Sequence, residues 1–198
     1  MRILFFTENF PPETNAAATR VYERALIWDK LGHKVEFITN FPNKFKGKKH
    51  EGYSSRLYRV DRIEGMKVVR VKTYVTTRQK VLFRALDQMS YMATSFIAGL
   101  FSRKPDVIIA STPQFFCGIS GLVLSMTRNV PFVLEVADIW TDTTKGTGAA
   151  SGVIFRLMRA VENYVYRKSR AIIVLTNAFR EELITRGVNQ DKIFVARN

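Results

Sequence analysis

Two runs of four consecutive apolar residues are the clearest indication of the fold. They are Val107-Ile108-Ile109-Ala110 and Ile172-Ile173-Val174-Leu175. Neither run alternates apolar with polar residues, which is typical of parallel strands that are covered on both faces. Along the whole chain, seven β-rich segments alternate with longer helical patterns. These segments are Arg2–Thr7, Lys34–Asn40, Lys67–Tyr74, Asp106–Ser111, Phe132–Val136, Ala171–Leu175 and Ile193–Ala196. This alternation predicts an α/β fold with a Rossmann-like, doubly wound, mostly parallel sheet.

Helices are expected between these strands. Their positions are a stripe that ends at Leu31-Gly32, residues 78–103, residues 152–170, and residues 177–187 with Asn177 as the cap. One pair of segments differs, because Arg59–Glu64 and Lys67–Tyr74 flank the dipeptide Gly65-Met66 without room for a helix. We therefore expect an antiparallel β-hairpin attached to the sheet.

Residues 107–127 carry no charge over 21 positions, which is close to the length that spans a bilayer. The polar segment from Ser111 to Gln114 interrupts the run and includes Pro113. A buried strand, a turn and a helix of small residues explain this pattern better than a transmembrane helix.

Chain length and cysteine content suit one intracellular domain. The 198 residues fit a single α/β domain with its own core. Cys117 is the only cysteine, so no internal disulfide can form, and this suits the cytoplasm.

Positive charge is concentrated in one part of the chain. The net charge is +14, and the segment from Pro42 to Lys80 contains 12 Lys or Arg residues against three acidic ones, a net charge of +9. Such a field attracts nucleic acid, anionic lipid head groups or phosphorylated substrates, although a solvated face is the simpler alternative. The helix expected at residues 78–103 has basic ends and an apolar middle, which suits either an anionic membrane surface or an ordinary core.

Ligands of such sheets bind beyond the carboxyl ends of the strands. Four segments should meet there: Thr7–Thr19, Asn40–Gly52, Ser111–Phe116 and Glu135–Gly148. The first lacks the G-x-G-x-x-G spacing of dinucleotide enzymes but leads into a helix, whose free N–H groups form an anion site. In the last, Asp138 directly follows a strand. Its carboxylate could orient a hydroxyl group or accept its proton, or it could simply cap the turn.

The stretch FFTENFPPETNAAATR at residues 5–20, with LGHKVEFITNFPN at residues 31–43, resembles the opening of bacterial family 4 glycosyltransferases, which are retaining enzymes with the GT-B fold. The similarity continues in order along the whole chain, through Gly47-Lys48, Gly52-Tyr53, Ser111-Thr112-Pro113, Glu135-Val136-Ala137-Asp138-Ile139-Trp140 and Val195-Ala196-Arg197-Asn198. The branch that it resembles contains envelope polysaccharide enzymes, including transferases of fucosamine-type sugars.

The resemblance implies that residues 1–198 are a single acceptor-side domain that ends at the hinge to an absent C-terminal donor domain. It places the donor diphosphate against a loop made of Asn15, Ala16, Ala17 and Arg20, and makes Asp138 the catalytic residue. The implied acceptor contacts are Glu13, Lys44, Lys46, Lys48, Thr112 and Pro113. Neither a metal ion nor a cofactor is expected, and a nucleoside-diphosphate sugar serves as the donor substrate.

The leading hypothesis is therefore transfer, with retention, of a hexosyl or N-acetylaminosugar unit to a lipid-linked glycan in polysaccharide biosynthesis, such as that of lipopolysaccharide or capsule. The expected location is cytoplasmic, peripheral to the inner face of the cell membrane, with the isolated half inactive. Two alternatives stay open, a basic nucleotide- or nucleic-acid-binding module and a membrane-peripheral binding protein without catalysis. Nucleic acid is not expected, because helix-turn-helix, ribonucleoprotein and zinc-finger signatures are missing from the sequence.

Overall fold

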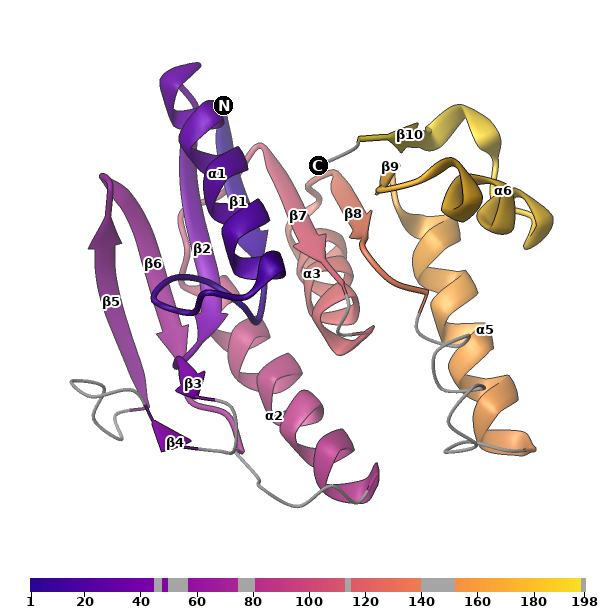
Figure 1. Cartoon of the computed structure of the whole chain (residues 1–198), viewed down its shortest axis with the longest axis horizontal. Coiled ribbons are helices and arrows are strands. Elements are labelled where there is room, and N and C mark those ends of the chain that lie inside the picture. Colours follow the sequence, from indigo (N-terminus) through magenta and orange to yellow (C-terminus); the bar gives the residue numbers. More distant parts are fainter. Residues whose placement is uncertain (45–47, 50–56, 75–80, 113–114, 140–151, 197–198) are drawn as a thin grey trace.

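The computed structural model describes residues 1–44, 48–49, 57–74, 81–112, 115–139 and 152–196. Its strands are β1 (Arg2–Phe6), β2 (Lys34–Asn40), β3 (Asn43–Lys44), β4 (Lys48–Lys49), β5 (Tyr58–Ile63), β6 (Met66–Val71), β7 (Val107–Ser111), β8 (Phe132–Val136), β9 (Ala171–Val174) and β10 (Ile193–Val195). Eight of them form one sheet in the order β10-β9-β8-β7-β1-β2-β6-β5, and β3 pairs with β4 separately. Within the large sheet only β5 and β6 pair antiparallel, so the expected α/β fold with an added hairpin is confirmed (Figure 1).

Helices cover both faces of this sheet. They are α1 (Ala16–Lys30), α2 (Val81–Leu100), α3 (Phe115–Arg128), α5 (Val153–Lys168), α6 (Asn177–Thr185) and the short 3-10 helix η1 (Gln190–Lys192). In Figure 1, α1 lies in front of the sheet, while α2 and α3 lie behind it. Strand β1 contributes side chains to the core on both faces of the sheet. Ile3 and Phe5 pack with α1, whereas Leu4 and Phe6 pack in the larger core on the opposite face.

The uncharged segment of residues 107–127 contains strand β7 and most of helix α3, as predicted. Helix α3 lies close to the sheet because Gly121 has no side chain: a Cβ there would be 2.8 Å from Cε2 of Phe132 and 3.1 Å from Cβ of Ala110. Among the described helices, none combines the length and apolar character needed to cross a membrane.

Local geometry corrects two details of the sequence prediction. The hairpin turn is Glu64-Gly65 rather than Gly65-Met66, and both turn residues have positive φ, +49° and +78°. Such a two-residue turn matches the twist of the flanking strands, so Met66 becomes the first, buried residue of β6. The cap of α6 is Thr176, whose hydroxyl accepts the Phe179 N–H at 3.2 Å, and Asn177 is the first helical residue.

The end of α1 agrees with the prediction in detail. Gly32 has φ +80° directly after the last helical turn. Its N–H donates to the Asp29 carbonyl at 2.8 Å, and the His33 N–H donates to the Trp28 carbonyl at 2.9 Å. These two bonds satisfy carbonyls that the helix end leaves open, which is the Schellman arrangement.

Candidate functional site

The site lies at the carboxyl edge of the sheet, the lower edge in Figure 1, where β1, β7 and β8 end side by side. Strand β1 leads into the loop of residues 7–15 and then into α1, while β7 ends at Ser111 and β8 ends at Val136. Three segments that lie far apart in the sequence therefore meet at one edge, which is where ligands bind in open α/β sheets.

Asn15 fixes the start of α1. Its side-chain oxygen accepts the Ala18 N–H at 2.9 Å, and its Nδ2 donates to Oδ1 of Asn9, also at 2.9 Å. The N–H groups of Ala16 and Ala17, the first two of the helix, have no acceptor among the described residues. These groups point out of the helix start and make it suitable for an anion.

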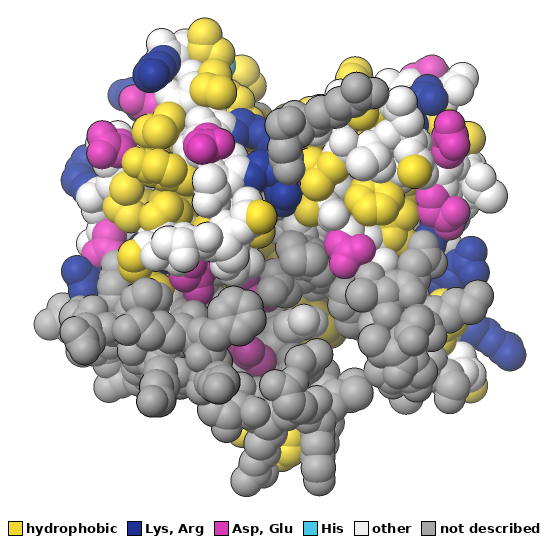
Figure 2. Space-filling model, viewed as in Figure 1, with side chains coloured by type: hydrophobic (Ala, Val, Ile, Leu, Met, Phe, Trp, Pro, Cys, Tyr) yellow, Lys and Arg dark blue, Asp and Glu magenta, His cyan; other side chains and the backbone are white. Residues whose placement is uncertain are grey.

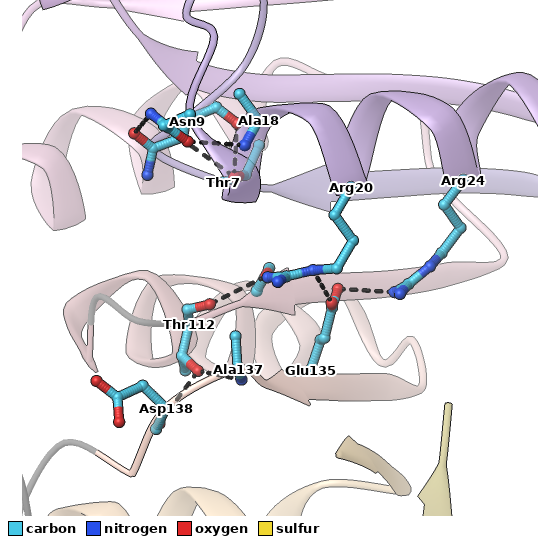
Figure 3. Close-up of polar contacts among 11 residues, drawn as sticks. Thr7, Asn9, Ala18, Arg20, Arg24, Thr112, Glu135, Ala137 and Asp138 are labelled. Atoms are coloured by element: carbon cyan, nitrogen blue, oxygen red, sulfur yellow. Dashed lines mark hydrogen bonds and ion pairs between the residues drawn. The ribbon is translucent and has the colours of Figure 1, made fainter. Parts of the chain in front are cut away.

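A buried carboxylate joins α1 to β8. Glu135 is completely buried, and its two oxygens form ion pairs with Nε of Arg20 at 3.0 Å and with Nη1 of Arg24 at 2.9 Å. The two arginines are four residues apart, so they extend from the same side of α1, as Figure 3 shows. Two cations against one anion leave a net positive charge here, and the Nη2 of Arg20 is buried without a hydrogen-bond partner among the described residues.

Positive side chains gather around a hollow on the face of the molecule shown in Figure 2. In the view of Figure 2, Lys and Arg side chains line a hollow between the α1 side and the α6 side of the chain. The side chains of Arg20 and Arg24 are 12% and 19% exposed, so both reach solvent while they hold Glu135. The arrangement can attract an anion without either arginine leaving its ion pair.

Thr112 connects the ends of β7 and β8 and positions Asp138. Its buried hydroxyl accepts the Ala137 N–H at 2.9 Å and donates to the Asp138 carbonyl at 3.4 Å. The Thr112 N–H donates to the Glu135 carbonyl at 2.9 Å. Asp138 itself is half-buried, so its backbone is held from β7 while part of its side chain stays accessible.

A second acidic group adjoins the start of the loop of residues 7–15. Burial raises the pKa of Glu8 well above its usual range, and the negative charges of Asp87 and Glu13 raise it further. Its Oε1 is buried without a hydrogen-bond partner among the described residues. Burial also raises the pKa of Asp87, although a hydrogen bond with Thr73 opposes that shift. Glu8 is thus a carboxyl group that holds a proton more tightly than an exposed glutamate.

The other predicted site residues lie in different parts of the chain. Glu13 stays in the loop of residues 7–15, where its Oε2 accepts the Phe10 N–H at 3.4 Å. Lys44 and Lys48 lie directly opposite each other in the β3–β4 ribbon. Lys46 and Pro113 lie outside the described residues. Within the described ranges, no group of three or more His, Cys, Asp and Glu side chains could hold a metal ion.

Sequence reasoning missed Arg24 and Glu8, and it did not pair Glu135 with an arginine. A signal existed for the first, because Arg20 and Arg24 are spaced to share one side of a helix, and Glu135 is the one charge within an apolar strand. Glu8 gave no such signal, since its burial depends on α2 packing over the end of β1.

Comparison with known proteins places the chain in a family. Residues 15–198 match the Glycosyl transferase 4-like domain. No curated protein sequence gives a match. Among solved structures, the catalytic domain of Starch Synthase IV from Arabidopsis thaliana bound to ADP and acarbose has a TM-score of 0.66 at 10% identity, covering 100% of this chain and 51% of that one.

A second similar structure is Anabaena HepE in complex with UDP-glucose, with a TM-score of 0.60 at 14% identity, covering 100% of this chain and 44% of that one. The chain therefore spans about half the length of these structures. At such identities the likeness shows the fold, and the family rests on the domain match. The chain belongs to the Glycosyl transferase 4-like domain family, and its sheet has the architecture of one half of a GT-B glycosyltransferase.

Proposed function

We propose that this chain is the acceptor-side domain of a glycosyltransferase that transfers a sugar, with retention, from a nucleoside diphosphate to a lipid-linked glycan. The observation that supports this most is the meeting, at one sheet edge, of an open helix start at Ala16 and Ala17 with the carboxylate of Asp138. The first suits a diphosphate and the second suits a hydroxyl group. The complexes of HepE with UDP-glucose and of the starch synthase with ADP agree with a nucleotide-sugar donor.

In the proposed reaction the acceptor oxygen forms a bond to the anomeric carbon while the bond from that carbon to the diphosphate oxygen breaks. The proton of the acceptor hydroxyl passes to the departing diphosphate. Asp138 hydrogen-bonds to the hydroxyl and orients it, and the N–H groups of Ala16 and Ala17 face the charge that develops on the diphosphate. Arg20 and Arg24 add positive potential from behind, through their net charge after pairing with Glu135. The proposal uses no metal ion, and a second, donor-binding domain completes the enzyme.

The lipid-linked acceptor and the location at the membrane are proposed from the positive charge of the chain. Lys44 and Lys48, side by side in the β3–β4 ribbon, would meet the phosphates of a lipid-linked acceptor, with Glu13, Thr112 and Asp138 nearer the sugar. A net charge of +14 favours a peripheral position on the anionic inner face of a cell membrane, which suits an enzyme of envelope polysaccharide synthesis.

Turnover tests the role of Asp138. The complete gene product is given nucleoside-diphosphate sugars and membrane lipid extract, and both the released nucleoside diphosphate and the labelled lipid are measured. Asp138→Asn should lower kcat by about 100-fold. Exposed Asp191→Asn on η1, the matched control, should leave it unchanged.

The same assay can contradict the proposal at two levels. Equal turnover of the Asp138 and Asp191 variants would remove Asp138 from the reaction. Absence of transfer from every nucleoside-diphosphate sugar would contradict the transferase itself. Inversion at the anomeric carbon, seen by NMR of the product, would contradict retention alone.

A further inference from the structure

A groove runs along the sheet face between the β5–β6 hairpin and α2 and continues onto the amino edge of the sheet. It consists of two cavities of about 920 Å³ and about 630 Å³, which share Glu36 and Lys67 in their linings. The larger cavity is apolar over most of its length and the smaller one is rich in cations. Volumes of this size hold small organic ligands.

The floor of the groove changes from apolar to cationic along the hairpin. Directly opposed residues of an antiparallel pair lie on the same face, and on this face the successive pairs are Tyr58 with Val71, Val60 with Val69, and Arg62 with Lys67. Val69 is buried, but its partner Val60 is 49% exposed. The helical layer therefore covers β6 and stops short of β5, which leaves an apolar face open.

One wall of the groove is the second half of α2. Ile97 is 53% exposed and Phe101, just after the helix, is 85% exposed. The opposite side of the same helix is core, since Tyr91 and Ser95 are completely buried. Apolar side chains gathered on an open surface beside an apolar floor mark a binding site rather than chance exposure.

The cationic end lies at the amino edge of the sheet. Arg62 and Lys67 lie opposite each other, and like charges in that position repel. Lys67 is paired with Glu36 at 2.7 Å, so one of the two charges is compensated within the protein. Exposed Lys34 and Arg103 line the same cavity and add to the positive potential. An anion placed here would relieve the repulsion.

From this geometry we propose that the groove binds an anionic membrane lipid, with its head group at the Arg62–Lys67 end and its acyl chain along the apolar floor and the Ile97–Phe101 wall. Charge complementarity and the order of the cross-strand pairs support this occupant. The inference extends the membrane association proposed above to a defined surface. It does not depend on sugar transfer, because the linings of the two cavities include none of Ala16, Ala17 and Asp138.

Flotation with vesicles tests the proposal without any nucleotide sugar. Vesicles of phosphatidylcholine with phosphatidylglycerol should carry the chain, and vesicles of phosphatidylcholine alone should carry much less. Ile97→Asp should lower the partition coefficient at least about tenfold, since it places a charge where the acyl chain lies. Arg62→Gln should lower it by about fivefold through the loss of one cation near the surface.

Matched controls come from α1 on the other face of the sheet. Ile27, which is 58% exposed, and exposed Lys30 provide Ile27→Asp and Lys30→Gln, and both should bind vesicles as the parent chain does. Phe101→Asp serves as a second groove variant that should fold as the parent does, because this side chain lies just after α2 and is 85% exposed. Equal loss of binding in groove and α1 variants, or no loss in any groove variant, would overturn the proposal.

Discussion

Glu135 is a carboxylate that the sheet buries completely, and its ion-pair partners among the described residues are the two arginines of α1. A buried charge deprived of its partners is costly, and here both partners come from one helix. The same contact that supports the positive potential at the candidate site therefore also fixes α1 on the sheet.

Removing the charge of Glu135 should destabilise the fold. Glu135→Gln leaves Arg20 and Arg24 facing each other without an anion, so the free energy of unfolding should fall by about 3 kcal/mol. Urea denaturation measures this loss. Glu181→Gln, at an exposed position of α6, should change stability by less than about 0.5 kcal/mol. Similar values for the two variants would show that the ion pairs contribute nothing.

Glu8 should make stability depend on pH in an unusual direction. Its pKa is raised in the folded chain, so between the ordinary pKa of glutamate, about 4.3, and the raised value the folded state binds more protons than the unfolded state. The stability that Glu8 contributes is complete below that window and is lost as the pH rises through it. An acidic group whose pKa is lowered on folding shows the opposite dependence, because the stability that it contributes is lost as the pH falls.

Glu8→Gln isolates this effect. The variant should match the parent at about pH 4 and be more stable by about 1–2 kcal/mol at about pH 8, because the neutral amide escapes the cost of burying a charge. Urea midpoints across this range give the difference. Glu23→Gln, on the exposed side of α1, is the matched control. A Glu8→Gln curve parallel to that of the parent would contradict the raised pKa.

At the scale of elements, the packing of α3 depends on a missing side chain. Gly121→Ala adds a methyl group that would lie 2.8 Å from the buried ring of Phe132. Neither the ring nor the helix can move without disturbing the core, so the variant should lose about 1–3 kcal/mol in urea denaturation. Val123→Ala on the same helix, at a position that is 41% exposed, should cost no more than about 0.5 kcal/mol. If both substitutions cost the same, α3 is not held at the close distance described.

The helices and strands could be predicted from the sequence because the apolar pattern and the residue preferences within each element indicate the same structure. Continuous apolar runs predict β7 and β9, and Gly32 predicts the end of α1. The β3–β4 ribbon was not predicted, and two positions were wrong by one residue, at Glu64 in the hairpin turn and at Thr176 before α6. In both places neighbouring residues are chemically suited to the same role, and only backbone geometry decides between them.

Less of the candidate site could be predicted from the sequence, since the site depends on contacts between segments that lie far apart in the chain. The sequence indicated which loops meet at the carboxyl edge but not that Arg20 faces Glu135 across 115 positions. That contact depends on where α1 lies on the sheet. The partial burial of Asp138 and the uncovered face of β5 are likewise properties of packing that no local pattern encodes.

At the scale of the whole molecule, the single thiol reports on opening of the core. Cys117 is completely buried on α3, and burial raises the pKa of its thiol. A buried, protonated thiol is a poor nucleophile, so a disulfide reagent should modify the native chain only as fast as the core opens. In urea, one thiol per chain should react at once. Rapid labelling of the native chain would show that α3 detaches from the sheet.

Strand β1 lies in the middle of the sheet, and its two edges are completed at very different moments of synthesis. One edge pairs with β2, which follows within 40 residues, whereas the other waits for β7, whose Val107 pairs with Ile3. At about 5–20 residues per second, the second edge emerges from the ribosome roughly 5–20 s after the first strand. During that interval the nascent chain presents an apolar, unpaired β-edge, which a chaperone can protect from aggregation.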